Sequence, residues 1–69
     1  MTRTETLKAL RNEEAALSQR AAEKGNLLAA AHRERNQANI RYLQGVCAQM
    51  SSDLAELARR IKEAEAQPE

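Results

Sequence analysis

The chain has 69 residues, with eleven Lys and Arg against ten Asp and Glu and a net charge of +1. A chain of this length forms one domain at most, and small folds usually need a disulfide, a metal or another subunit. One cysteine and one histidine exclude an internal disulfide and a four-ligand zinc site within one chain. Assembly with a further subunit is therefore the expected source of stability.

The composition favours helix throughout the chain. Alanine, leucine, glutamate, arginine, lysine and glutamine dominate, and these residues are strong helix formers. Phe and Trp are absent, and the only proline, Pro68, lies next to the end of the sequence. Residues that favour strands or loops are correspondingly few. We therefore expect an all-α fold.

The first helix is expected over about residues 3–31. Thr2 and Glu5 fit a capping box, in which the hydroxyl accepts a backbone N–H and the carboxylate reaches back, and Thr4 is a rival cap. Glu14 and Lys24 interrupt the apolar stripe and are expected at its edge. The stripe recurs at spacings of three, four and seven, and consists of Leu7, Leu10, Leu17, Ala21, Leu28 and Ala31.

The second helix is expected over about residues 38–66 and carries four consecutive heptads. A strict repeat of seven residues keeps one seam facing a partner helix and favours supercoiling. Glu56 and Arg60 are spaced for a favourable ion pair on its surface. The two core positions of the repeat hold Ile40, Cys47, Leu54 and Ile61, and Leu43, Met50, Leu57 and Ala64.

The two stripes are out of phase, so the chain is expected to turn between them, within residues 24–39. Extending the second heptad backwards places Arg33 and Asn36 in core positions, which favours a turn in 32–39. Gly25-Asn26 is the better local turn signal, because glycine suits a helix C-terminus and asparagine caps the next helix. One uninterrupted helix in a dimeric coiled coil is a third alternative. We favour an antiparallel helical hairpin with coiled-coil packing, a single domain over 1–69 that assembles into a bundle.

The sequence lacks the features of a membrane segment, a signal peptide and a catalytic site. The longest apolar run, 27–31, is too short to cross a bilayer, and the N-terminal residues lead into no signal-peptide core. A lone cysteine, Cys47, indicates a reducing compartment, and we expect a cytoplasmic protein. Two thin helices offer no catalytic pocket, and no phosphate-binding glycine loop is present. We expect no enzyme activity, and no catalytic, cofactor-binding or metal-ligating residue, with Cys47 a small core hydrophobe and His32 exposed.

The expected function is binding of another protein, or of a second copy of the chain, along the heptad seam. Leu27, beside Leu28 of the first stripe, and Tyr42 and Val46, beside the seam, are candidate contacts for a third helix. The predicted partner-binding residues are Ile40, Tyr42, Leu43, Val46, Met50, Leu54, Leu57 and Ile61.

A regulator that binds RNA or DNA as a dimeric helical bundle is the alternative function. Its basic patch would consist of His32, Arg33, Arg35 and Arg41, with Arg20 and Lys24 nearby. Glu34 interrupts this patch, Tyr42 is the sole aromatic residue for base stacking, and the net charge is nearly zero. The protein partner is therefore the favoured reading.

The run Ile40-Arg41-Tyr42-Leu43-Gln44, followed by apolar Met50, Leu54 and Leu57, resembles the second helix of the small co-chaperones of type III secretion needle subunits. The resemblance covers about a quarter of the chain, with near-identities at Leu43 and Gln44, and departs from the family at the turn and at Ile40, where the family tends to carry tyrosine. It implies a helical hairpin that pairs with a larger helical-repeat chaperone and keeps a needle subunit soluble before export.

Overall fold

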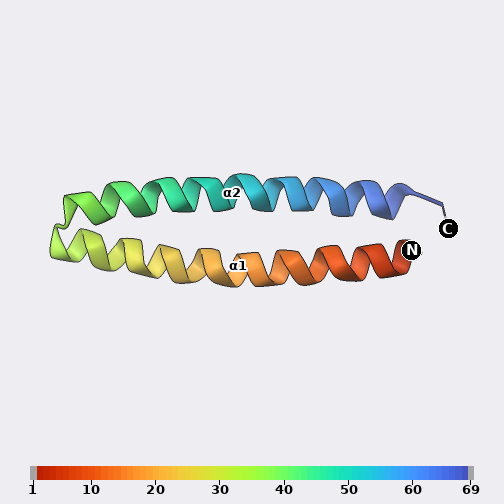
Figure 1. Ribbon diagram of the computed structural model, residues 1–69, viewed down its shortest axis with the longest axis horizontal. Coiled ribbons are helices and arrows are strands. Elements are labelled where there is room, and N and C mark those ends of the chain that lie inside the picture. The colour runs from red at the N-terminus through yellow and green to blue at the C-terminus, as the bar shows by residue number, and fades with distance from the viewer. Residues whose placement is uncertain (1, 69) are drawn as a thin grey trace.

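The computed structural model describes residues 2–68 and consists of two long helices, α1 (Arg3–Glu34) and α2 (Gln37–Ala66). They run antiparallel, side by side along their whole length, so that the start of α1 and the end of α2 lie at one end of a rod (Figure 1). The rod measures 52 × 14 × 13 Å. The predicted all-α helical hairpin is confirmed, with α1 one turn longer than expected.

A two-residue turn joins the helices at Arg35-Asn36. Arg35 adopts the left-handed conformation, with φ of 56°, and its N–H donates to the His32 carbonyl at 3.1 Å. The N–H of Asn36 donates to the Ala31 carbonyl at 3.0 Å, and together these two bonds form a Schellman motif. The Asn36 side chain then caps α2 by accepting from the Asn39 N–H at 3.2 Å.

This turn lies within 32–39, and Gly25-Asn26 lies inside α1. A turn at Arg35-Asn36 places the whole stripe of α1 against the whole heptad seam of α2, so matching of the two seams outweighs the local preference of glycine for a helix end. The non-glycine residue in a left-handed conformation is the local cost of this arrangement.

The open end of the hairpin is also tied together. Thr2 caps α1, its Oγ1 accepting from the Glu5 N–H at 3.1 Å, which is the cap expected from the sequence. The Arg3 guanidinium donates to the carbonyls of Glu65 at 3.4 Å and Gln67 at 3.3 Å. A cation at the last carbonyls of a helix interacts favourably with the helix dipole, so Arg3 links the start of α1 to the end of α2.

The core is thin and lies mainly on α2. Among residues 2–68 six hydrophobic residues are buried, and only the first of them belongs to α1: Ala31, Ile40, Leu43, Leu57, Ile61 and Ala64. Near the turn, Ala31, Ile40 and Leu43 form one cluster, against which Leu28 packs. Glu14 and Lys24 are half-buried, like the leucines of the α1 stripe that they interrupt. Between 44 and 56 no residue of α2 is buried, so the middle of the rod is weakly packed.

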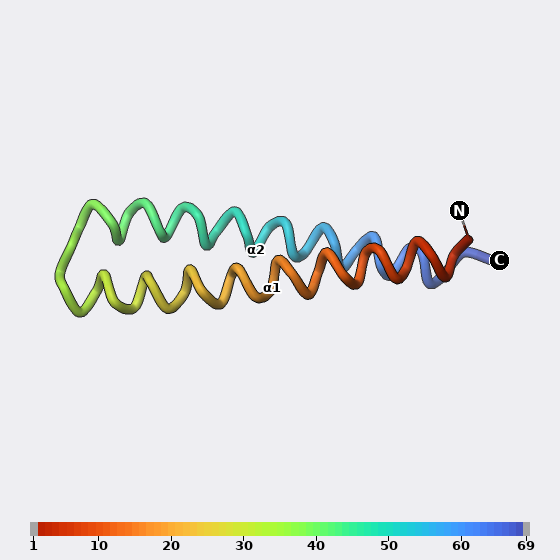
Figure 2. Tube along the Cα trace, turned by 60° about the horizontal axis from the view of Figure 1, so that its bottom comes forward, coloured from red at the N-terminus to blue at the C-terminus, as the bar shows by residue number. Residues whose placement is uncertain are grey.

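The helices cross at a shallow angle. In Figure 2 the two tubes are well separated near the turn and overlap near the chain ends, whereas Figure 1 shows them side by side. Such a crossing is what a heptad seam on α2 favours. In the part of the chain that the structure describes, neither helix combines the length and the hydropathy that a membrane span requires.

Candidate functional site

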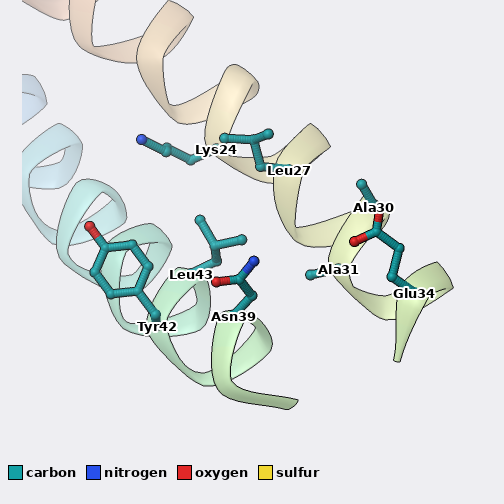
Figure 3. Close-up of a pocket in the computed structure, with 8 residues that line it drawn as sticks. All are labelled: Lys24, Leu27, Ala30, Ala31, Glu34, Asn39, Tyr42 and Leu43. Atoms are coloured by element: carbon teal, nitrogen blue, oxygen red, sulfur yellow. The ribbon is translucent and has the colours of Figure 1, made fainter. Parts of the chain in front are cut away.

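A groove opens between the two helices next to the turn, with a volume of about 320 Å³. We call it the turn-end groove. Figure 3 shows its lining side chains, which come from the last three turns of α1 and the start of α2. They are Lys24, Leu27, Ala30, Ala31, Glu34, Asn39, Tyr42 and Leu43.

The floor of the groove is buried and its two apolar rims are exposed. Ala31 and Leu43 belong to the core cluster and form the floor. Leu27 of α1 is 51% exposed and Tyr42 of α2 is 65% exposed. Among residues 2–68 these are the large exposed hydrophobic side chains, and both stand over one groove. Adjacent exposed apolar groups around a concave surface are typical of protein interaction sites.

Small and charged residues give the groove its shape and polarity. Ala30 and Ala31 are short, so the wall of α1 beyond Leu27 is low. Lys24 and Glu34 lie at opposite ends of the α1 wall, ten residues apart and hence separated by about 15 Å along the helix axis. The groove thus carries one charge of each sign, with apolar side chains between them.

The surface that continues from the groove along α2 carries no charge. No Asp, Glu, Lys or Arg occurs from Tyr42 to Ser52. Within this stretch Val46, Cys47 and Met50 are only half-buried by the packing of α1. Depletion of charged residues distinguishes the centre of a protein interface from ordinary surface. The groove and the uncharged stretch together form the candidate site.

The predicted partner-binding residues fall into three groups. Ile40, Leu43, Leu57 and Ile61 are buried in the hairpin, where α1 already covers them. Val46, Met50 and Leu54 are half-buried and retain accessible surface. Tyr42 is exposed and is the predicted residue that projects most freely over the groove.

Leu27 was anticipated from the sequence as a contact outside the seam, and the structure places it across the groove from Tyr42. Lys24, Ala30 and Glu34 were not anticipated as part of the site. The sequence carries a signal for them, because Lys24, Leu27, Ala31 and Glu34 follow the spacing of one helix face. That face meets α2 only when the turn is placed at Arg35-Asn36.

The basic residues of the alternative function gather around the turn. His32, Arg33, Arg35 and Arg41 are all exposed there, with Glu34 among them. Arg20 is exposed further along α1, and Lys24 is a half-buried part of the groove.

Residues considered for other chemistry lie apart. Cys47 is a free, half-buried thiol at its heptad position, and His32 is exposed. Over residues 2–68 no three His, Cys, Asp or Glu side chains are grouped as a metal site requires.

A chain of ion pairs runs along α2 towards the open end of the hairpin. Glu56 accepts from Arg60 at 3.3 Å, the predicted pair, and also from Arg59, which bridges to Glu63. The hydrogen bond from Arg59 lowers the pKa of the Glu56 carboxyl below its ordinary value of 4.5, against a partial opposing effect of desolvation. The same carboxylate raises the pKa of Arg59. These groups are solvent-exposed, and their pairing stabilises α2 itself.

No protein-family model, no curated protein and no solved structure matches the chain, so the geometry described above is what argues for its function.

Proposed function

We propose that this protein is a non-enzymatic helical interaction module of the cytoplasm, which binds a partner helix along the turn-end groove and the adjoining uncharged stretch of α2. The observation that carries the proposal is the exposure of Leu27 and Tyr42 over one groove, from two different helices. Separate exposed hydrophobics are ordinary on a protein surface, whereas a matched pair around a concave floor is not.

The thin core gives an energetic reason for a partner. None of the core side chains of residues 2–68 is completely buried, since each of the six keeps between 3% and 9% of its surface accessible. Full burial of a large hydrophobic side chain stabilises by about 1.5–3 kcal/mol. A helix laid over Leu27, Tyr42 and Val46 therefore supplies burial that two helices cannot provide for each other.

The finer form of the proposal is a small co-chaperone or adaptor. The resemblance of Ile40–Gln44 to the second helix of needle-subunit co-chaperones supports a partner that is itself helical. In this hairpin the resembling run includes Tyr42 on the rim of the groove and Leu43 on its floor. A co-chaperone role requires that the hairpin protect apolar helix surface of another protein, which is the chemistry this groove offers.

The test uses the purified chain as bait in an extract of its native host. Leu27→Ser with Tyr42→Ser removes both rims, and Asn26→Ser with Gln37→Ser is the matched control at exposed positions outside the groove lining and the uncharged stretch. We expect wild type and control to retain the same proteins and the rim variant to lose them, at equal helix content by circular dichroism. Retention of the same proteins by the folded rim variant contradicts the proposal.

A second candidate function is supported by the exposure of His32, Arg33, Arg35 and Arg41 at one end of the rod. A regulator that grips RNA or DNA there would lose binding in Arg33→Glu with Arg35→Glu and would bind less tightly as salt rises. If these charge reversals leave the capture of partner proteins intact while the rim variant abolishes it, the hypothesis of nucleic-acid binding is wrong.

A further inference from the structure

The hairpin exposes more surface than a compact protein of its size. A compact monomer of 7.7 kDa exposes about 4,300 Å², whereas this hairpin exposes 5224 Å². The difference is about 900 Å² per chain, close to the roughly 800 Å² that each partner buries in a specific protein complex. One interface of ordinary size on each chain would therefore bring the surface to the expected value.

The charges of the turn-end groove are self-complementary. Lys24 and Glu34 sit at its two ends on the same helix. When a second α1 lies antiparallel across the first, with the two-fold axis level with Ala29, Lys24 of each chain faces Glu34 of the other. A two-fold axis makes this contact twice, as in any isologous interface. The net charge of +1 leaves little repulsion between two copies.

The same arrangement also matches shape. At that register Leu27 of one chain lies level with Ala30 and Ala31 of the other, so that a large side chain meets two small ones. Each Leu27 then enters the low part of the opposite groove, and Tyr42 closes its side. The groove is therefore suited to a copy of its own wall.

From this area, charge pattern and shape we propose that the partner of the turn-end groove is a second copy of this chain, docked antiparallel through α1 to form a two-fold symmetric four-helix bundle. The inference rests on the proposed function and identifies its partner. The bundle buries Leu27 and Tyr42 of both chains in its centre.

The first test is the mass in solution, measured by sedimentation equilibrium over a range of concentrations. We expect twice the 7.7 kDa of the chain. Leu27→Ser should raise the dimer Kd by about a hundredfold, because two leucine side chains lose their cover. A monomer at every concentration overturns the inference.

The second test is a charge exchange that a second copy alone satisfies. Lys24→Glu places glutamate against Glu34, Glu34→Lys places lysine against Lys24, and each should raise Kd by about tenfold. Mixed in equal amounts, the two variants regain both attractive pairs. We therefore expect native mass spectrometry to show mainly the mixed dimer, with a Kd near that of wild type.

Lys62→Glu is the matched control, since Lys62 is an exposed lysine outside the groove lining and its reversal should leave Kd unchanged. Failure of the mixture to recover overturns the antiparallel α1 docking. A monomeric chain that still captures another protein through Leu27 and Tyr42 overturns this inference and leaves the proposed function standing. If the rim variant neither loses captured proteins nor weakens assembly, both are wrong.

Discussion

The two helices have nearly the same length, 32 and 30 residues, yet they differ in how much of the core they supply. α2 provides five of the six buried hydrophobics, and α1 provides only Ala31. The cause lies in the inward stripes. That of α2 is apolar at every heptad position, whereas that of α1 includes Glu14 and Lys24 among small alanines.

The difference teaches that the two helices have different roles: α2 determines how the helices pair, and α1 leaves apolar surface accessible to a partner. α2 specifies the hairpin, because its unbroken seam fixes which face meets α1. The apolar residues of α1 are less completely buried, since Leu27 is exposed and the other leucines of α1 are half-buried. A partner that covers α1 would bring the burial of its apolar residues closer to that of α2.

The largest expected effect tests this difference between the helices by replacing one leucine of each helix with alanine. Leu43→Ala in α2 removes a residue that is 6% exposed and should lower the free energy of unfolding by about 2–3 kcal/mol. Leu28→Ala in α1 removes a half-buried neighbour of the same cluster and should lower it by about 1 kcal/mol. Urea unfolding followed by circular dichroism measures both.

The concentration of the protein sharpens that experiment. If the two losses are equal in dilute, monomeric protein, the contrast between the helices is wrong. If they become equal only at high concentration, an associated copy covers α1, because linkage to assembly adds stability with concentration.

The contrast between local and long-range signals explains which features of the fold could be predicted from the sequence. The seam of α2, the stripe of α1 and the Thr2 cap follow from local spacing, and each lies where it was predicted. The position of the turn stayed open between two alternatives, because Gly25-Asn26 is the better local signal whereas the phase slip between the two stripes favours 32–39, where the turn lies. The groove depends on that position, since Leu27 and Tyr42 become neighbours only when Ala31 and Ile40 are brought together at the turn.

A smaller effect tests why α1 is the weaker helix. Glu14 is half-buried in the inward stripe between Leu10 and Leu17. Glu14→Leu completes the stripe and should raise the free energy of unfolding by about 1 kcal/mol, because the new side chain is partly removed from water. The thermal midpoint measures the gain. Glu23→Leu, at an exposed position of α1, is the control and should change the midpoint little; an equal gain there would mean that helix propensity, not the seam, sets the stability.

The smallest effect concerns the ion pairs that Glu56 makes with Arg59 and Arg60 on α2. Because pairing lowers the pKa of Glu56 below 4.5, the Glu56 carboxyl releases its proton more readily in the folded state than in the unfolded state. The stabilisation is therefore present above pH 4.5, and it is lost as the pH falls through the lower pKa of the folded state. Glu56→Gln should melt slightly below wild type at pH 7, with the difference vanishing in acid. Glu23→Gln, on exposed α1 surface, should not show this pH dependence, and if it does, the pairing on α2 contributes nothing specific to that helix.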